Sequence, residues 1–280
     1  MYLERSIDKE LHIWREESDR KPLLVRGARQ VGKSSSIKKF GESFDSFLEV
    51  NFEEHKRVHS LFEGDLTPQV LSENLSIMFD LDIVPGKTLL FFDEIQACIP
   101  AISSLRFFYE KMPGLHVIAA GSLLEFALAE IPSFGVGRIR SIYMYPLSFD
   151  EFLIGTGHFK LLKKKRKANS QDLLAIPIHN KLLDLLKKFL IIGGMPEVVE
   201  KYVIHNDLRG CQRVLDDLTS SLRTDFTKYK NRVPSSRIHE VFKSIVRQAG
   251  GKFVYKKASQ NLNTIQIKEA LELLIMAGLV

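Results

Sequence analysis

Residues 23–34 read LLVRGARQVGKS, an apolar run followed by Gly27, four further residues and then Gly32-Lys33-Ser34. This spacing fits the pattern G-x-x-x-x-G-K-[ST], in which a strand leads into a phosphate-binding loop and then a helix. Both glycines allow backbone conformations that residues with a Cβ resist, so consecutive N–H groups can point into one concavity. A helix beginning near Lys33 adds the positive end of its dipole. The stretch therefore predicts a P-loop.

The residues of this loop have distinct expected roles in binding ATP. Lys33 brings a positive charge to the β- and γ-phosphates, and the Ser34 hydroxyl is placed to ligate Mg²⁺. The alternative is a glycine-rich turn that matches by chance, and the strand before the loop and the helix after it argue against that. The expected nucleotide contacts are Gly27, Ala28, Arg29, Gln30, Val31, Gly32, Lys33, Ser34 and Ser35.

A second landmark is the apolar run at residues 88–92, which ends in Asp93-Glu94. A fully apolar run of this length is typical of a strand covered on both faces of a parallel sheet. Ligands of such sheets bind at the carboxyl ends of the strands. We therefore expect Asp93 to hold Mg²⁺, directly or through water, and Glu94 to orient and deprotonate the attacking water. A strand ending in Asp-Glu is weak evidence alone but becomes strong beside a complete P-loop.

A third apolar run, residues 115–120, leads into Gly121-Ser122. Ser122 is expected to contact the γ-phosphate or the water, and it could also cap a helix at residues 123–130. A glycine-rich loop at residues 132–138 ends in Arg138, and a strand is expected to follow at 139–145. Arg138 is therefore expected at the edge of the sheet away from the nucleotide bound by the same chain. Ser148 and Glu151 then form a capping box that starts the next helix.

Composition places the chain among ordinary globular proteins. Of its 280 residues, 45% are hydrophobic and 26% are charged. Charges near the N-terminus interrupt any secretory signal, and no uncharged run reaches membrane-spanning length, so we expect a cytoplasmic protein with no membrane partner. Cys98 and Cys211 suggest neither a disulfide framework nor a catalytic thiol. His55 and His59 have helical spacing but lack the further ligands that zinc requires.

Charge is distributed unevenly along the chain. Residues 1–158 carry 17 Lys/Arg and 23 Asp/Glu, a net of −6, whereas residues 159–280 carry 23 and 11, a net of +12. A basic second half is expected if this part meets a polyanion such as DNA. The alternative is a basic surface with no partner, because charge alone says little about specificity.

The second half is expected to be helical, with a domain boundary near residue 158. Residues 155–167 are expected to be a loop, and its lysine-rich end favours a solvated linker over a nucleic-acid contact. Three C-terminal helices with a tight turn at residues 261–263 suggest a helix-turn-helix. Residues 278–280 look like the start of a strand, so a winged helix would be only partial here.

Together these stretches resemble the AAA+ superfamily of P-loop ATPases. The closer resemblance is to prokaryotic AAA-family ATPases with a winged helix and a C-terminal domain of restriction-endonuclease-like fold. That last domain is absent here, so no activity of it is assigned to this chain. The resemblance rests on LLVRGARQVGKSS at 23–35, LLFFDEIQ at 89–96, AAGSLLEF at 119–126, VGRIRSIYMYPLSFDEF at 136–152 and GGMPE at 193–197.

The resemblance implies an α/β fold with five parallel strands in the order 5-1-4-3-2. It implies an ATPase core at residues 1–158, a helical lid at 159–232 and a partial winged helix at 233–280. Lys33 and Ser34 match the Walker A motif, Asp93 and Glu94 the Walker B motif, and Ser122 matches sensor 1. Arg138 occupies the arginine-finger position with Arg140 in reserve, and Pro196 of the G-x-P motif would pack on adenine.

Two functions follow as hypotheses. The first is an ATPase that hydrolyses ATP to ADP and phosphate with Mg²⁺ and so drives a conformational change, on DNA and as a homo-oligomer. Glu94 favours it, since hydrolysis needs a carboxylate poised on water. The second is a nucleotide-dependent binding switch with negligible turnover. A kinase acting on a small acceptor is a third reading, and the Asp-Glu pair and the helix-turn-helix argue against it.

Overall fold

The structure is a computed structural model of the chain, and it describes residues 1–131, 137–225 and 233–280. Most of the glycine-rich loop expected at 132–138 and most of the charged segment at 225–232 lie outside the described residues. The chain forms two compact units, Met1–Ile204 and His205–Val280. This division by packing falls inside the segment predicted as the lid, and the three-domain division stays a prediction.

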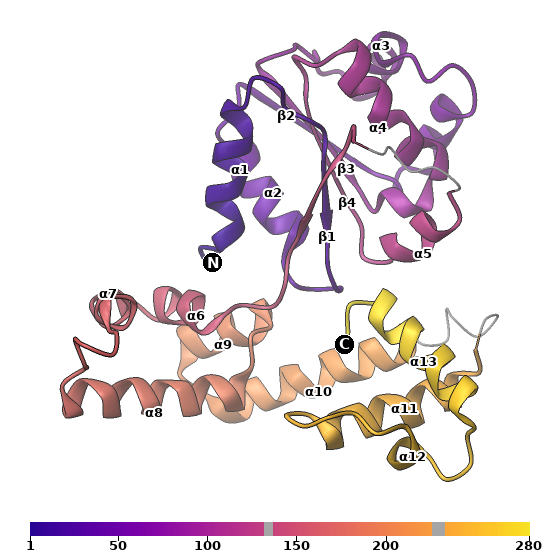
Figure 1. Cartoon of the computed structure of the whole chain (residues 1–280). Helices are drawn as coiled ribbons and strands as arrows, with labels where there is room; N and C mark the ends of the chain where they lie inside the picture. Colours follow the sequence, from indigo (N-terminus) through magenta and orange to yellow (C-terminus); the bar gives the residue numbers. More distant parts are fainter. Residues whose placement is uncertain (132–136, 226–232) are drawn as a thin grey trace. The chain divides into compact units, whose positions relative to one another are not determined.

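The first unit is built on one parallel sheet (Figure 1). The strands pair in the order β2-β3-β4-β1-β5, and every pair is parallel. This is the predicted order 5-1-4-3-2 counted from the other edge, so the expected α/β fold is confirmed. The strands are β1 Leu23–Arg26, β2 Ser46–Asn51, β3 Thr88–Asp93, β4 His116–Ala120 and β5 Arg140–Tyr143.

Helices cover both faces of the sheet because alternate strand residues point to opposite sides. In β3, Leu89 and Phe91 pack in one apolar cluster with α1 (Ser6–Glu16) and α2 (Lys33–Gly41). Leu90 and Phe92 pack in a second cluster on the other side. The elements of that side are 3-10 helices η1 (Lys56–Phe62) and η2 (Ile95–Ala97), and helices α3 (Pro68–Phe79), α4 (Ile99–Lys111) and α5 (Leu124–Ala129). All six residues of β3 are buried, as the apolar run predicts.

Four helices follow the sheet in the first unit, namely α6 Phe149–Gly155, α7 Phe159–Lys167, α8 Ile176–Ile192 and α9 Pro196–His205. The capping box at the start of α6 is confirmed. The loop expected at residues 155–167 is wrong, because residues 159–167 form α7. Leu161 and Leu162 bury against α6 and α8, while Lys165 and Arg166 pair with Asp150 of α6. Tertiary packing of two leucines thus stabilises a helix whose local sequence is dominated by like charges.

The second unit contains α10 (Leu208–Asp225), α11 (Ser235–Gln248), α12 (Tyr255–Ala258) and α13 (Thr264–Met276), with α11 packed against the two helices that follow it. The expected strand start at residues 278–280 is wrong. Gly278 has a φ of 70° just beyond α13, and Leu279 N–H donates to the Leu274 carbonyl at 3.0 Å. These residues therefore form a helix C-terminal cap. The winged helix stays a prediction.

Candidate nucleotide-binding site

The loop between β1 and α2 has the backbone that its glycines require. Gly27 has a φ of 139°, Gln30 of 63° and Gly32 of 96°, all in the left-handed half of conformational space. A Cβ at position 27 would also lie 2.1 Å from the Met144 carbonyl oxygen. Only glycine therefore fits at position 27. The strained φ of Gln30 is typical of a functional loop rather than of a simple turn.

The Lys33 ammonium lies inside this loop. Its Nζ donates to the carbonyl oxygens of Gly27 at 2.9 Å and Ala28 at 2.8 Å. Burial lowers the pKa of Lys33 to about 8, although the negative charges of Glu94 and Asp93 oppose the shift. The predicted phosphate-binding lysine is therefore held at the centre of the predicted cradle.

Ser34 and Asp93 meet as the sequence predicts, although they are far apart in the chain. The Ser34 hydroxyl lies 3.1 Å from Asp93 Oδ1 and 3.0 Å from Oδ2. Burial raises the pKa of Asp93, which shows that an unneutralised negative charge is unfavourable here. A hydroxyl and a carboxylate are hard oxygen donors of the kind that Mg²⁺ prefers, with water and phosphate oxygens completing its shell. The residues present therefore fit a magnesium ion.

Glu94 is held beside this pair by contacts from three groups. Its φ is 48°, a left-handed conformation that is rare outside glycine. Its Oε2 accepts hydrogen bonds from Ser122 Oγ at 3.3 Å, from Ser122 N–H at 3.4 Å and from Gln96 Nε2 at 2.5 Å. The expected capping role of Ser122 is wrong, because α5 has Leu123 at its N-cap without a side-chain bond. The carboxylate and the predicted sensor therefore contact each other.

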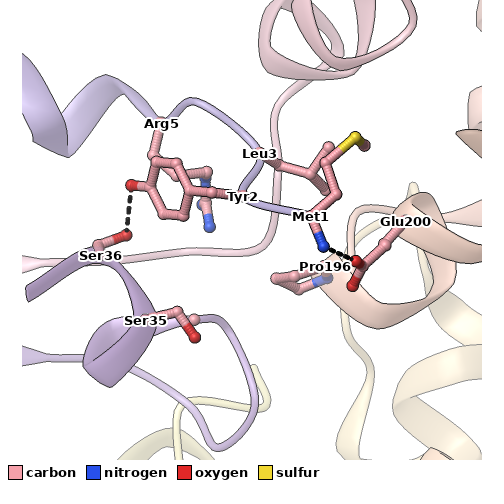
Figure 2. Close-up of a pocket in the computed structure, with 9 residues that line it drawn as sticks. Met1, Tyr2, Leu3, Arg5, Ser35, Ser36, Pro196 and Glu200 are labelled. Carbon is pink, nitrogen blue, oxygen red and sulfur yellow. Dashed lines mark hydrogen bonds and ion pairs between the residues drawn. The ribbon is translucent and has the colours of Figure 1, made fainter. Parts of the chain in front are cut away.

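A small pocket lies next to the P-loop (Figure 2), between residues 1–5, the start of α2 and the start of α9. Pro196 forms part of its wall, and the Pro196 ring lies 3.5 Å from the position that a Cβ on Gly32 would take. Glu200 of α9 accepts from the amino group of Met1. The G-x-P proline that was expected at an adenine therefore lines a pocket beside the phosphate loop. Its full lining is Met1, Tyr2, Leu3, Arg5, Gly32, Ser35, Ser36, Pro196 and Glu200.

Comparison with known proteins agrees with this geometry. A family model described as an AAA domain matches residues 19–153, which contain the loop, Asp93, Glu94 and Ser122. Residues 19–153 form an AAA domain of the P-loop type. A second model, for a domain of unknown function (DUF8612), matches residues 183–280. No curated protein matches the chain.

One solved structure resembles the chain in fold. The Walker-type ATPase of Pyrococcus abyssi superposes with a TM-score of 0.59 at 16% identity, over 98% of this chain and 89% of that one. The Orc1 protein of Aeropyrum pernix, solved in complex with DNA, covers 98% of this chain and 84% of its own, with a TM-score of 0.38 at 11% identity. The likeness to the Pyrococcus abyssi protein shows the fold alone.

Arg5 lies in the first unit, before the AAA domain, and the sequence analysis did not single it out. Its buried guanidinium donates to the carbonyl oxygens of Val31 in the P-loop at 2.8 Å and of Tyr145 at 2.6 Å. It also pairs with buried Glu151 at 3.2 Å. Burial alone would raise the pKa of Glu151, but hydrogen bonds from Ser6 and Ser148 and the charge of Arg5 lower it overall. No local pattern marks Arg5, because its partners are distant in sequence.

Arg138 is not brought to the nucleotide site of its own AAA domain. It precedes β5, and Arg140 of β5 pairs in parallel register with Leu23 at the start of β1. The P-loop follows the other end of β1, so Arg138 lies at the opposite end of the sheet. It forms an ion pair with Glu110 of α4. The sequence placed Arg138 away from its own nucleotide, and the sheet register agrees with that.

The candidates that the sequence disfavoured take structural roles. His59 Nε2 contacts the Phe52 carbonyl oxygen at 2.8 Å. Cys98 and Cys211 are both buried and do not form a disulfide with each other. Burial raises the pKa of Cys98, which lowers its reactivity. Among the described residues, no group of three His, Cys, Asp or Glu side chains could hold a metal ion. None of the helices described has the length and apolar character to cross a bilayer.

Proposed function

We propose that the chain binds ATP with Mg²⁺ and hydrolyses it to ADP and phosphate. The observation that carries the proposal is the convergence of Lys33, Ser34 and Asp93 with Glu94 at the carboxyl ends of β1 and β3. A phosphate site needs only the lysine, the serine and the loop. Glu94 adds a carboxylate able to take a proton from water, and that requirement belongs to hydrolysis.

Each residue has a defined part in this proposal. Backbone N–H groups of residues 27–35 and the Lys33 ammonium bind the β- and γ-phosphates. Ser34 and Asp93 hold Mg²⁺, which when bound neutralises charge on the phosphate oxygens. Glu94 orients the water and accepts its proton, while Ser122 supports Glu94 at the end of β4.

The pocket beside Pro196 is the proposed base site. Its volume of about 90 Å³ is well below the range of roughly 300–1,000 Å³ for small-molecule sites. A purine ring therefore requires its two walls, residues 1–5 and the start of α9, to move apart. In this proposal the separation of these walls couples base binding to the helices that follow the sheet.

A second candidate function is DNA binding, favoured by the charge of α7. Lys163, Lys164 and Lys167 are exposed on this helix, and the structure shows no ion pair for them among the described residues. Lys165 and Arg166 pair with Asp150 and are less available. The exposed lysines of α7 are the proposed phosphate contacts of the first unit. Lys256 and Lys257, which are exposed on α12, are separate candidates in the second unit. Such contacts read little sequence information.

Nucleotide binding and phosphate release, measured together, test the main proposal. Lys33→Ala removes the cation from the loop and should lose ATP binding, because the charge-assisted contacts to the β- and γ-phosphates disappear. Lys38→Ala is the matched control, since Lys38 lies on the same helix but pairs with Glu49. Unchanged ATP affinity in Lys33→Ala would refute the site. ATP binding by the parent without phosphate release would instead support the nucleotide-dependent switch.

A further inference from the structure

The side chain of Gln96 bridges the ends of two neighbouring strands. Gln96 lies in η2, directly after β3, and its Nε2 donates to Glu94 Oε2 at 2.5 Å. Its Oε1 is buried and has no hydrogen-bond partner among the described residues. A buried carbonyl without a partner is unfavourable, so the position of this amide needs an explanation. The amide nitrogen of Gln96, which donates to Glu94, provides this explanation.

The orientation of the amide follows from its neighbours. If the nitrogen and oxygen were exchanged, an oxygen would face Glu94 Oε2 at the same short distance, and two acceptors would repel each other. The arrangement with Nε2 toward the carboxylate is therefore the favourable one. Oε1 has no partner because the amide is oriented to direct its nitrogen, which carries both N–H donors, at Glu94.

Gly121 provides the space that the amide occupies. A Cβ at position 121 would lie 2.0 Å from Gln96 Oε1 and 3.1 Å from Gln96 Cδ. Gly121 follows β4 and precedes Ser122, whose N–H and hydroxyl are the other donors to Glu94 Oε2. All these donors therefore converge on one carboxylate oxygen. Oε1 of Glu94 is left as the oxygen available to a water molecule.

We propose that Gln96 is a positioning residue for hydrolysis, which fixes the carboxylate of Glu94 by holding Oε2 against Ser122. This inference rests on the proposed ATPase function. Gln96 does not touch the nucleotide or the water, and it acts only through Glu94. Without it the side chain of Glu94, on a backbone already in a left-handed conformation, samples other rotamers. A misplacement of about 1 Å at a reacting group can lower a rate about 100-fold.

Two substitutions test this role in complementary ways. Gln96→Met keeps a similar length and removes the donor, while Gly121→Ala keeps Gln96 and displaces its amide. Alanine is compatible with the backbone at position 121, because Gly121 is not among the glycines with positive φ. Gly64→Ala is the matched control, since a Cβ there meets nothing within 4 Å. ATP affinity, KM, kcat and the thermal midpoint are measured for each variant.

We expect Gln96→Met and Gly121→Ala each to lower kcat about 10- to 100-fold, with KM and ATP affinity within about twofold of the parent. The Gly64→Ala variant should match the parent. In a Glu94→Gln background, Gln96→Met should change the residual rate by less than about twofold, because Gln96 acts through that carboxylate. A residue needed only for the fold would lower the rate in both backgrounds.

The outcomes separate this inference from the proposed function. If the parent hydrolyses ATP and both variants keep its kcat, or raise it, the positioning role is wrong and the ATPase proposal stands. If Gln96→Met lowers the hydrolysis rate by the same factor in the parent and in the Glu94→Gln background, the positioning role is also wrong. If the parent binds ATP and releases no phosphate, the ATPase proposal fails first and this inference fails with it. If Gln96→Met has a much lower thermal midpoint than the parent, the kcat of Gly121→Ala alone decides whether Gln96 positions Glu94.

Discussion

At the scale of single residues, the site depends on side chains that contact each other because they lie at the carboxyl ends of neighbouring parallel strands. In the proposed ATPase, Glu94 is the carboxylate that hydrolysis requires, because it lies beside the proposed magnesium ligands and contacts Ser122. Its neighbour Asp93 accepts a hydrogen bond from Ser34 and is a proposed magnesium ligand. The two adjacent carboxylates therefore have different surroundings, and we propose different roles for them.

Replacement of Glu94 by glutamine should separate binding from hydrolysis. Glu94→Gln preserves the shape of the side chain and its bond to Ser122, but it removes the base. We expect ATP affinity within about twofold of the parent and a loss of turnover of about 100-fold or more. Parallel measurements of ATP binding and steady-state phosphate release check this. Turnover at the parent rate would mean that another group positions the water.

His116 gives a residue-scale prediction about stability and pH. It lies buried in β4 with ring contacts to Trp14 at 5.7 Å and Phe44 at 4.8 Å, and its Nδ1 has no partner among the described residues. Burial lowers the pKa of His116 to about 4, and the nearby charges of Arg20 and Arg15 add to this. The unfolded chain therefore binds a proton below about pH 6.5 that the folded chain does not take up until about pH 4.

Stability should consequently fall as pH decreases from about 6.5 to about 4, by a few kcal/mol from this residue. His116→Phe keeps an aromatic ring and should lose this part of the slope, measured as the denaturation midpoint against pH. His179→Asn replaces an exposed histidine of α8 and should leave the slope unchanged. Equal slopes for the parent and His116→Phe would contradict the assignment.

At the scale of elements, α7 shows how packing overrides local charge. Leu161 and Leu162 bury against α6 and α8, and this burial outweighs the mutual repulsion of the lysines that follow them. The result is a helix that presents its exposed charges on an ordered surface rather than on a solvated linker. Ordered cations are suited to the regularly spaced phosphates of DNA.

The salt dependence of DNA binding tests the role proposed for α7. Replacing Lys163, Lys164 and Lys167 together by glutamine should weaken binding of duplex DNA, with little effect of its sequence. Each lost phosphate contact should reduce the slope of log affinity against log salt by about 0.9. The control replaces Lys9, Lys56 and Lys87, which are exposed in the acidic half. The proposal would be refuted if the parent did not bind DNA at low salt. It would also be refuted if the α7 variant and the control variant showed the same salt slope.

At the scale of the whole molecule, the parallel sheet separates Arg138 from its own phosphate loop. A head-to-tail neighbour could present Arg138 to the next site, and such heterologous contacts close into a ring or continue as a helix. We therefore propose that Arg138 acts on the nucleotide of an adjacent copy. The competing role is its ion pair with Glu110, in which both side chains are partly exposed. Pairs of this kind contribute only about 0–1 kcal/mol.

A mixing experiment distinguishes these two roles for Arg138. Arg138→Ala should lower hydrolysis about 10³-fold or more if a guanidinium serves the neighbouring site. Mixing it with Lys33→Ala should restore turnover, because an intact Arg138 then meets an intact loop. Glu110→Ala is the matched control and should keep activity. If Arg138→Ala hydrolyses ATP normally, the proposed action on an adjacent copy is wrong. The same holds if the mixed variants assemble but turnover is not restored, and Arg138 would then serve only in its ion pair with Glu110.

The resemblance of the motifs implied the strand order, whereas the sequence by itself determined the phosphate loop and the meeting of Ser34 with Asp93. Two physical reasons made this predictable. The phosphate loop is a local motif whose glycines are required by backbone geometry, as the close contact of Gly27 with Met144 shows. Parallel strands bring their carboxyl ends to one edge, so polar residues after separate apolar runs must converge there.

Only the tertiary structure decided the contacts that depend on distant partners. Gln96 follows Glu94 closely in sequence, but its place against Gly121 depends on how β3 and β4 pair. Arg5 looks like an ordinary helix-flanking cation until Val31, Tyr145 and Glu151 surround it. The helix α7 also depends on other elements, because its two leucines are buried only when α6 and α8 pack beside them. Side-chain partners chosen by packing leave no periodic signal in the local sequence.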